Sequence, residues 1–204
     1  MVMEYLCCMS VLGIPIWIIR KQGKERERIH NGFEQMANQL GFRFNPHHNW
    51  DGIVMTGAIR NYRCSLAFET HISRSSTGSG SSKHLKTVWS VSLMKPMNIG
   101  LDITPHFWGD GLLLRKQQDI ETGNAEFDKI FRIKGYDESE IRDFLTPNRM
   151  QALLRFNMSR PSSQYMRVTD NEISVRYPTI SPDIQMAMDT MMDAVSFTED
   201  IEFG

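Results

Sequence analysis

The chain has few cysteines and almost no net charge. Its three cysteines, Cys7, Cys8 and Cys64, match neither a disulfide framework nor the ligand spacing of a zinc site. The 204 residues include 23 Lys and Arg against 24 Asp and Glu, so the net charge is −1 and there is no overall basic field to attract nucleic acid. The composition therefore predicts no metal site, no cofactor and no nucleic-acid partner.

Motifs of known catalytic and phosphate-binding sites are also missing. The sequence contains no G-x-S-x-G elbow and no G-x-x-x-x-G-K-[ST] or G-x-G-x-x-G loop, and the stretch Ser73–Ser82 has the composition of a flexible hairpin tip. His47 and His48 are adjacent in a turn-rich stretch, so their side chains point apart and rarely bind one ion together. The sequence therefore predicts that the protein is not an enzyme. A hydrolase stays as an alternative, because carboxylates such as Asp102 and Asp110 can pair in space without a sequence pattern.

The most informative feature that is present is the apolar run from Tyr5 to Ile19. Counted from Val2, it has the length of one bilayer core as a helix, roughly 27 Å. Tyr5 and Trp17 lie near its ends, where aromatic rings favour the headgroup layer. Residues 1–20 are therefore predicted to form a single transmembrane anchor. Because the positive charges follow the run, the rest of the chain is predicted on the cytoplasmic side of the membrane. Five basic residues are predicted to face anionic lipid headgroups, namely Arg20, Lys21, Lys24, Arg26 and Arg28.

Three other interpretations of this run remain. A cleaved signal peptide carries its positive charge before the apolar part, whereas here the charge follows it. A helix lying flat on a membrane needs a polar face, which this run lacks. A helix buried in the core is the third, since Gly13 and Pro15 are not ideal helix residues. In a membrane, Ser10 and Gly13 would let a second helix approach closely, while Cys7 and Cys8 are either apolar packing residues or acylation sites.

The remaining sequence predicts an α+β fold: a single N-terminal transmembrane helix, then an antiparallel-sheet domain with flanking helices. An apolar stripe with helical spacing predicts a juxtamembrane helix over residues 21–40, and alternating strands predict an antiparallel β meander over residues 41–115. A second α+β unit is expected over residues 125–204. It is predicted to contain a strand over Phe127–Ile133, helices capped at Asp137 and Thr146, a hairpin turn at Asp170-Asn171 and a last helix opening at Ser181. The stripe of the first helix consists of Ile29, Phe33, Met36 and Leu40, and the clearest strand alternates Cys64, Leu66 and Phe68 with Arg63, Ser65 and Glu69.

Two patterns in the second unit resemble those of a protein family. D-x-x-F-x-I-x-G-x-D covers residues 128–137, and L-T-P followed by L-L covers residues 145–154. They are similar to a strand and a helix in uncharacterised bacterial membrane-anchored proteins, where the strand carries Val in place of Ile133. The resemblance implies a bacterial origin, and with it the inner membrane as the predicted location, a membrane-proximal domain and an α+β fold. It implies no activity and no catalytic residues.

The predicted function is that of a non-enzymatic, membrane-anchored accessory subunit of an integral-membrane complex, for example a respiratory or photosynthetic one. Met188 and Met192 share one side of the last helix, and Phe107-Trp108 precedes a glycine-rich loop, so these four residues are candidate partner contacts. A membrane-tethered ligand-binding or sensory domain is the alternative and a hydrolase the second alternative. A ligand in a cleft would favour the former, and paired carboxylates or histidines in a cleft would favour the latter.

Overall fold

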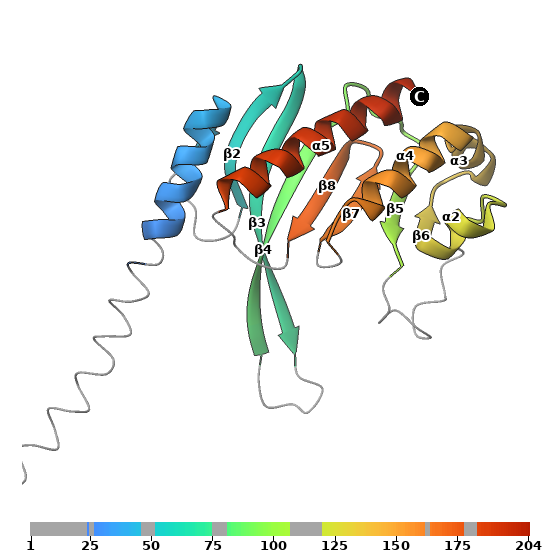
Figure 1. Ribbon diagram of the computed structural model, residues 1–204. Helices are drawn as coiled ribbons and strands as arrows, with labels where there is room; N and C mark the ends of the chain where they lie inside the picture. The colour runs from blue at the N-terminus through green and yellow to red at the C-terminus, as the bar shows by residue number, and fades with distance from the viewer. Residues whose placement is uncertain are drawn as a thin grey trace, which may run out of the picture.

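The computed structural model describes residue 24 and residues 27–45, 52–74, 81–106, 120–161, 164–177 and 183–204 of the chain. In this part, one antiparallel sheet of eight strands has the order β1-β2-β3-β4-β8-β7-β5-β6, and helices pack on it (Figure 1). The strands are β1 (Arg43–Phe44), β2 (Gly52–Ile59), β3 (Tyr62–Arg74), β4 (Ser81–Ser92), β5 (Asp102–Pro105), β6 (Phe131–Lys134), β7 (Tyr165–Thr169) and β8 (Glu172–Tyr177). The helices are an N-terminal one that includes residues 27–40, α2 (Ala125–Ile130), α3 (Glu138–Phe144), α4 (Pro147–Met158) and α5 (Ile184–Phe203).

The sheet has one buried apolar face. Five residues in register from β3 to β5 form one apolar row across it: Cys64, Val91, Ile173, Val168 and Ile103. Their neighbours along each strand point to the opposite face, as the period of two requires, and Arg63 and Glu69 there are exposed. The predicted alternation of β3 is therefore confirmed from Cys64 to Phe68, and the core lies between the sheet and its helices.

The topology interleaves the two predicted halves of the chain. The strands β1 to β4 form a meander, but the chain does not add β5 beside β4. β8 pairs with β4 instead, and β5 lies between β7 and β6. Strands from residues 41–115 and from residues 125–204 consequently share one sheet and one core.

The N-terminal helix packs its apolar stripe on the same face. Phe33 and Met36 are fully buried, and the ring of Phe33 meets that of Phe68 edge-on with centroids 5.2 Å apart. The irregularity of β2 lies between Ile53 and Met55, and Gly57 pairs regularly with Cys64. Gly57 makes room for Phe42, because a Cβ there would lie 2.1 Å from Cδ1 of that ring.

The predicted strand over Phe127–Ile133 is wrong in its first half. Asn124 accepts hydrogen bonds from the backbone N–H groups of Glu126 and Phe127, so it caps helix α2, and β6 begins only at Phe131. The buried Phe127 and Phe131 stand four residues apart, which suits a helix as well as a strand followed by a bend. The hydrogen bonds that the Asn124 side chain accepts favour the helix over the strand at the start of this segment.

Other helix starts follow the sequence closely. Asp137 accepts hydrogen bonds from the N–H groups of Ser139 and Glu140 and caps α3. Thr146, which directly precedes Pro147, accepts one from the N–H of Arg149 and caps α4. Both predicted caps are therefore confirmed. The last helix is capped by Asp183 and not by Ser181, because Asp183 accepts from the N–H of Met186. Arg74 and Ser81 belong to β3 and β4, so these strands extend into the stretch predicted as a loop, and residues 75–80 lie outside the described part.

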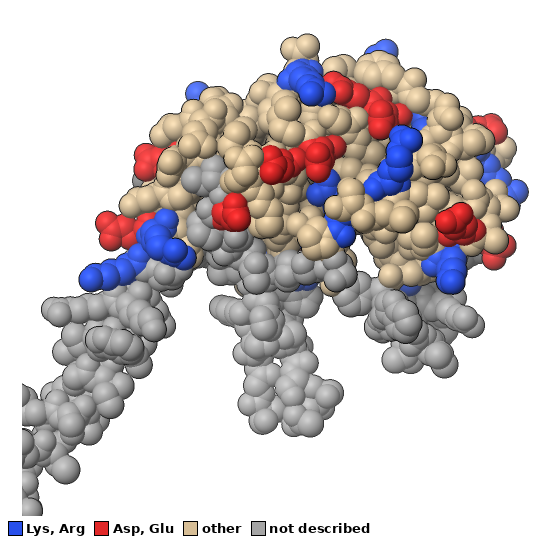
Figure 2. Space-filling view, viewed as in Figure 1, with Lys and Arg blue, Asp and Glu red and all other residues tan. Residues whose placement is uncertain are grey.

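The predicted transmembrane helix is corrected by the structure. Among the described residues, no helix combines the length and the apolarity that a bilayer crossing requires. The longest, α5, has 20 residues and packs along the sheet (Figure 1), but it carries five acidic side chains, and acidic side chains gather on this face of the molecule (Figure 2). The predicted anchor residues Tyr5, Ser10, Gly13 and Trp17 lie outside the described residues.

Candidate functional site: an apolar pocket at the end of helix α5

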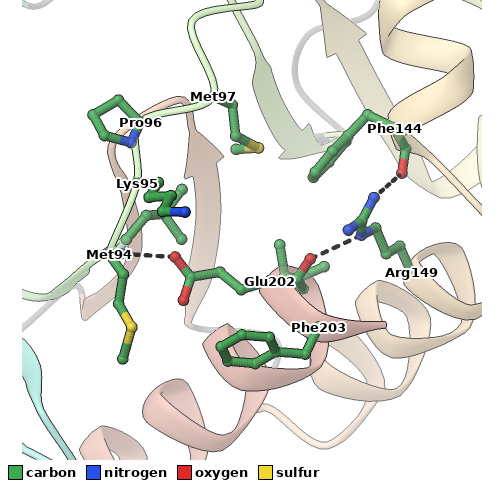
Figure 3. A pocket seen from close by; sticks show the side chains of 10 residues that line it. Met94, Lys95, Pro96, Met97, Phe144, Arg149, Glu202 and Phe203 are labelled. Atoms are coloured by element: carbon green, nitrogen blue, oxygen red, sulfur yellow. Dashed lines mark hydrogen bonds between the residues drawn. The ribbon is translucent and has the colours of Figure 1, made fainter.

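A pocket of about 380 Å³ lies where the last turn of α5 meets the loop after β4. One wall is the loop 93–97, and the opposite wall is formed by the end of α3 and the first turn of α4 (Figure 3). Its lining side chains are mainly apolar, with Lys95, Arg149 and Glu202 as the charged exceptions. The complete lining consists of Leu93, Met94, Lys95, Pro96, Met97, Phe144, Arg149, Ile201, Glu202 and Phe203.

The loop wall is fixed by the β7–β8 hairpin turn. The Asp170 carboxylate accepts three backbone hydrogen bonds, from Ile99 at 3.2 Å, Gly100 at 2.8 Å and Leu101 at 2.9 Å. Its carbonyl accepts one more from the N–H of Met97 at 3.0 Å. Three successive N–H groups around one carboxylate hold the loop without help from a regular ladder.

Glu202 joins α5 to the sheet and to the loop. One carboxylate oxygen accepts from the Met94 N–H at 2.7 Å, and the other accepts from the Tyr62 hydroxyl at 2.8 Å. Burial of Tyr62 and its hydrogen bond to the Glu202 carboxylate raise the pKa of this phenol, so Tyr62 stays a neutral donor. Both oxygens of Glu202 are therefore engaged within the protein.

Arg149 caps the ends of two helices at once. Its Nε donates to the carbonyl of Ile201 at 2.8 Å, and Nη1 donates to the carbonyl of Phe144 at 3.0 Å, while the guanidinium lies 4.6 Å from the centroid of the Phe144 ring. Carbonyls at helix C-terminal ends lack intrahelical donors, and a cation there also opposes the negative end of the helix dipole. The arginine thereby holds the α3 and α5 walls together.

The pocket is open, and its rim is apolar. Met94 is 51% exposed and Phe203 is 77% exposed, which makes them two of the most exposed large apolar side chains in the described residues. Within the same part of the chain, neither Lys95 nor Arg149 forms an ion pair with a carboxylate. The arrangement offers an apolar recess beside two positive charges, which suits recognition of another molecule.

A second, more polar hollow of about 490 Å³ adjoins the pocket across Phe203. It lies between α4 and the end of α5 and presents the exposed side chains of Asn148, Gln151 and Arg155. Phe203 lines both hollows, so a ligand longer than one side chain can contact both.

The predicted site residues are elsewhere. Phe107 and Trp108 lie outside the described part, as do His47, His48, Asp110 and three of the predicted headgroup residues, Arg20, Lys21 and Arg26. Lys24 and Arg28 belong to the N-terminal helix. On α5, Met188 is half-buried and Met192 is 38% exposed, and neither lines the pocket. Asp102 binds Arg167 with two hydrogen bonds, at 2.9 and 3.0 Å.

Sequence reasoning missed the pocket residues. Lys95-Pro96-Met97 reads only as a turn, and Phe203 stands at the end of an acidic helix. The available signal in the sequence was the acidic end of the last helix, with Glu199, Asp200 and Glu202. The negative end of the helix dipole disfavours these side chains, so they need compensating partners from other segments. No group of three or more His, Cys, Asp or Glu side chains in the described residues has the geometry of a metal site.

Comparisons with known proteins support the fold alone. No protein-family model matches the chain, and no curated protein matches it. Among solved structures, the crystal structure of the mycobacterial trehalose monomycolate transport factor A, TtfA, is similar with a TM-score of 0.51 and 13% sequence identity. The match covers 86% of this chain and 94% of that one. The chain therefore has the same overall fold as TtfA.

Proposed function

We propose that this protein is a non-enzymatic accessory subunit that docks onto a larger assembly through the pocket at the end of α5. The observation that carries the proposal is an open apolar pocket with exposed Met94 and Phe203 on its rim. Clustered exposed apolar side chains around a recess are typical of protein-protein contact sites. TtfA is described as a transport factor, which is compatible with an accessory role, but the shared fold carries no argument about transport by this chain.

The rigidity of the pocket supports the same function. Its walls are tied by the Asp170, Glu202 and Arg149 hydrogen bonds, so docking orders little new structure. A pre-formed site loses less conformational entropy on binding than a flexible one. The predicted integral-membrane partner, the inner-membrane location and the contact of residues 20–28 with anionic lipid stay predictions from the sequence.

The test is co-purification of the full chain from its own cells in mild detergent. Replacing Phe203 by Ser is expected to reduce the amount of the associated assembly at least tenfold, as for an anchor residue near the centre of an interface. Met158→Ser is the matched control, because Met158 at the end of α4 is also 77% exposed but does not line the pocket. Equal recovery with both variants would contradict the proposal.

A small-molecule ligand is the second candidate function. The volume of about 380 Å³ falls within the range of ligand pockets, and the apolar walls with a few charged groups fit their usual chemistry. Under this alternative, Phe203→Ser would leave co-purification unchanged while a small ligand is lost from the purified protein, as native mass spectrometry would show.

A further inference from the structure

The charges around the pocket restrict what can fill it. Arg149 uses Nε and Nη1 for helix carbonyls, and among the described residues no partner is present for Nη2. Lys95 is exposed on the opposite wall. Any apolar group that fills the recess removes water from these cations, and this desolvation is unfavourable unless the ligand supplies negative charge.

Glu202 does not supply that charge. Its two oxygens already accept hydrogen bonds from Met94 and Tyr62, and it belongs to the wall that those bonds assemble. The pocket carries two positive side chains and one negative one, so its charge favours an anion. Because its guanidinium is held by two bonds, Arg149 presents Nη2 in a fixed direction.

We propose that the pocket binds a segment of a partner protein in which a large apolar side chain stands next to an acidic residue. The apolar side chain would lie among Met94, Met97, Phe144 and Phe203, and the carboxylate would contact Lys95 on the loop wall, while Arg149 on the opposite wall adds to the positive charge around the recess. This inference rests on the proposed docking function and names the chemistry of the partner.

The second hollow favours a polypeptide as the ligand over a lipid-like molecule with a single acyl chain. Beyond Phe203 the surface is polar, and the amide side chains of Asn148 and Gln151 are suited to hydrogen bonding with a peptide backbone. A continuing acyl chain would meet these amides and Arg155 without gaining apolar contact.

The test uses three capped peptides, acetyl-Gly-Leu-Phe-Asp-Gly-amide and its counterparts with Asn or Lys in place of Asp. The readout is NMR of full-length protein labelled at the methionine methyl groups. Met94 and Met97 report on the pocket, and Met36 and Met55, fully buried in the core, serve as internal references. The Asp peptide is expected to shift the Met94 and Met97 signals and to bind at least fivefold more tightly than the Asn peptide, while the Lys peptide binds most weakly.

Charge reversal at Lys95 provides the matched variant. Lys95→Glu should remove the preference for Asp over Asn. Lys129→Glu, at an exposed position of α2, changes the net charge equally and should keep that preference. Equal binding of all three peptides would overturn the anionic requirement while leaving docking at the pocket intact. Shifts caused by dodecanoate but by none of the peptides would overturn the peptide assignment. No shift with any probe would also overturn the inference, whereas the proposed function is judged separately by co-purification.

Discussion

Among the residues that hold the walls of the pocket, Asp170 is predicted to contribute most to the free energy of unfolding. Its carboxylate accepts from three consecutive loop N–H groups, and removal of the acceptor would leave them without their partner. We expect Asp170→Ala to lower the free energy of unfolding by about 3 kcal/mol, measured by urea denaturation. Asp143→Ala, at an exposed position on α3, should change it by less than about 0.5 kcal/mol. A similar small effect for both variants would contradict this role.

Cys64 links stability to alkaline pH. Burial raises the pKa of its thiol from 9.0 to about 11. Below pH 9 the thiol is protonated in both states. Between pH 9 and 11 it ionises only when unfolded, so its contribution to stability is lost as the pH rises. We expect the free energy of unfolding to fall by up to about 2 kcal/mol between pH 9 and 11, and by less in Cys64→Ala. An equal dependence on pH in both proteins would contradict the raised pKa of Cys64.

Arg160 is a buried cation with incomplete hydrogen bonding. Its side chain is 5% exposed, its guanidinium lies 3.8 Å from the centroid of the Phe156 ring, and Nε and Nη2 have no hydrogen-bond partner in the described part of the chain. Burial lowers the pKa of this group. Arg160→Met should therefore be neutral or stabilising by about 1 kcal/mol in thermal unfolding. A loss above about 2 kcal/mol would show that the guanidinium is fully paired.

Among the secondary-structure elements, the C-terminal end of α5 carries acidic side chains where the negative end of the helix dipole disfavours them. Glu199 pairs with Arg60 at 3.0 Å and Asp200 with Arg155 at 3.7 Å, while Arg149 caps the carbonyl of Ile201. These contacts offset the three acids in the last turn, so a strongly acidic helix end is stable here.

The helix end gives a direct prediction for Arg149. Arg149→Ala should lower the free energy of unfolding by about 2 kcal/mol, because two carbonyls lose a charged donor. Arg149→Lys should recover little of it, since one ammonium does not reproduce the planar fork that reaches both Ile201 and Phe144. Hydrogen exchange should rise at the last turn of α5 in both variants, and full rescue by Lys would contradict the double cap.

Local signals predicted elements well and the pocket poorly. The caps at Asp137 and Thr146 and the turn at Asp170-Asn171 follow from side chains that bond within a few residues. The α2 helix was missed because the Asn124 cap competed with a strand-like run of apolar residues. The pocket combines three stretches that lie far apart in the sequence, residues 93–97, 144–149 and 201–203, and no local pattern predicts that they meet.

At the scale of the whole molecule, one antiparallel sheet unites both halves of the chain. The pairing of β4 with β8 and of β5 with β7 ties residues from the first half to the last hairpin, so both stretches share one core. The N-terminal helix and α5 contact the same face, through Phe33 on Phe68 and Glu202 on Tyr62. The end of α5 thereby becomes the place where the loop after β4 and the helices α3, α4 and α5 meet in an open pocket.

Site-specific photocrosslinking in living cells is the sharpest test of whether a partner protein docks at the pocket. A benzoylphenylalanine would replace Phe203 on the pocket rim or, as the control, the equally exposed Met158. Docking through the pocket should give a discrete crosslinked protein band from position 203 that is absent from position 158 and weakened by Lys95→Glu. Crosslinks of equal yield from both positions, or none from position 203, would contradict a docking role for the pocket.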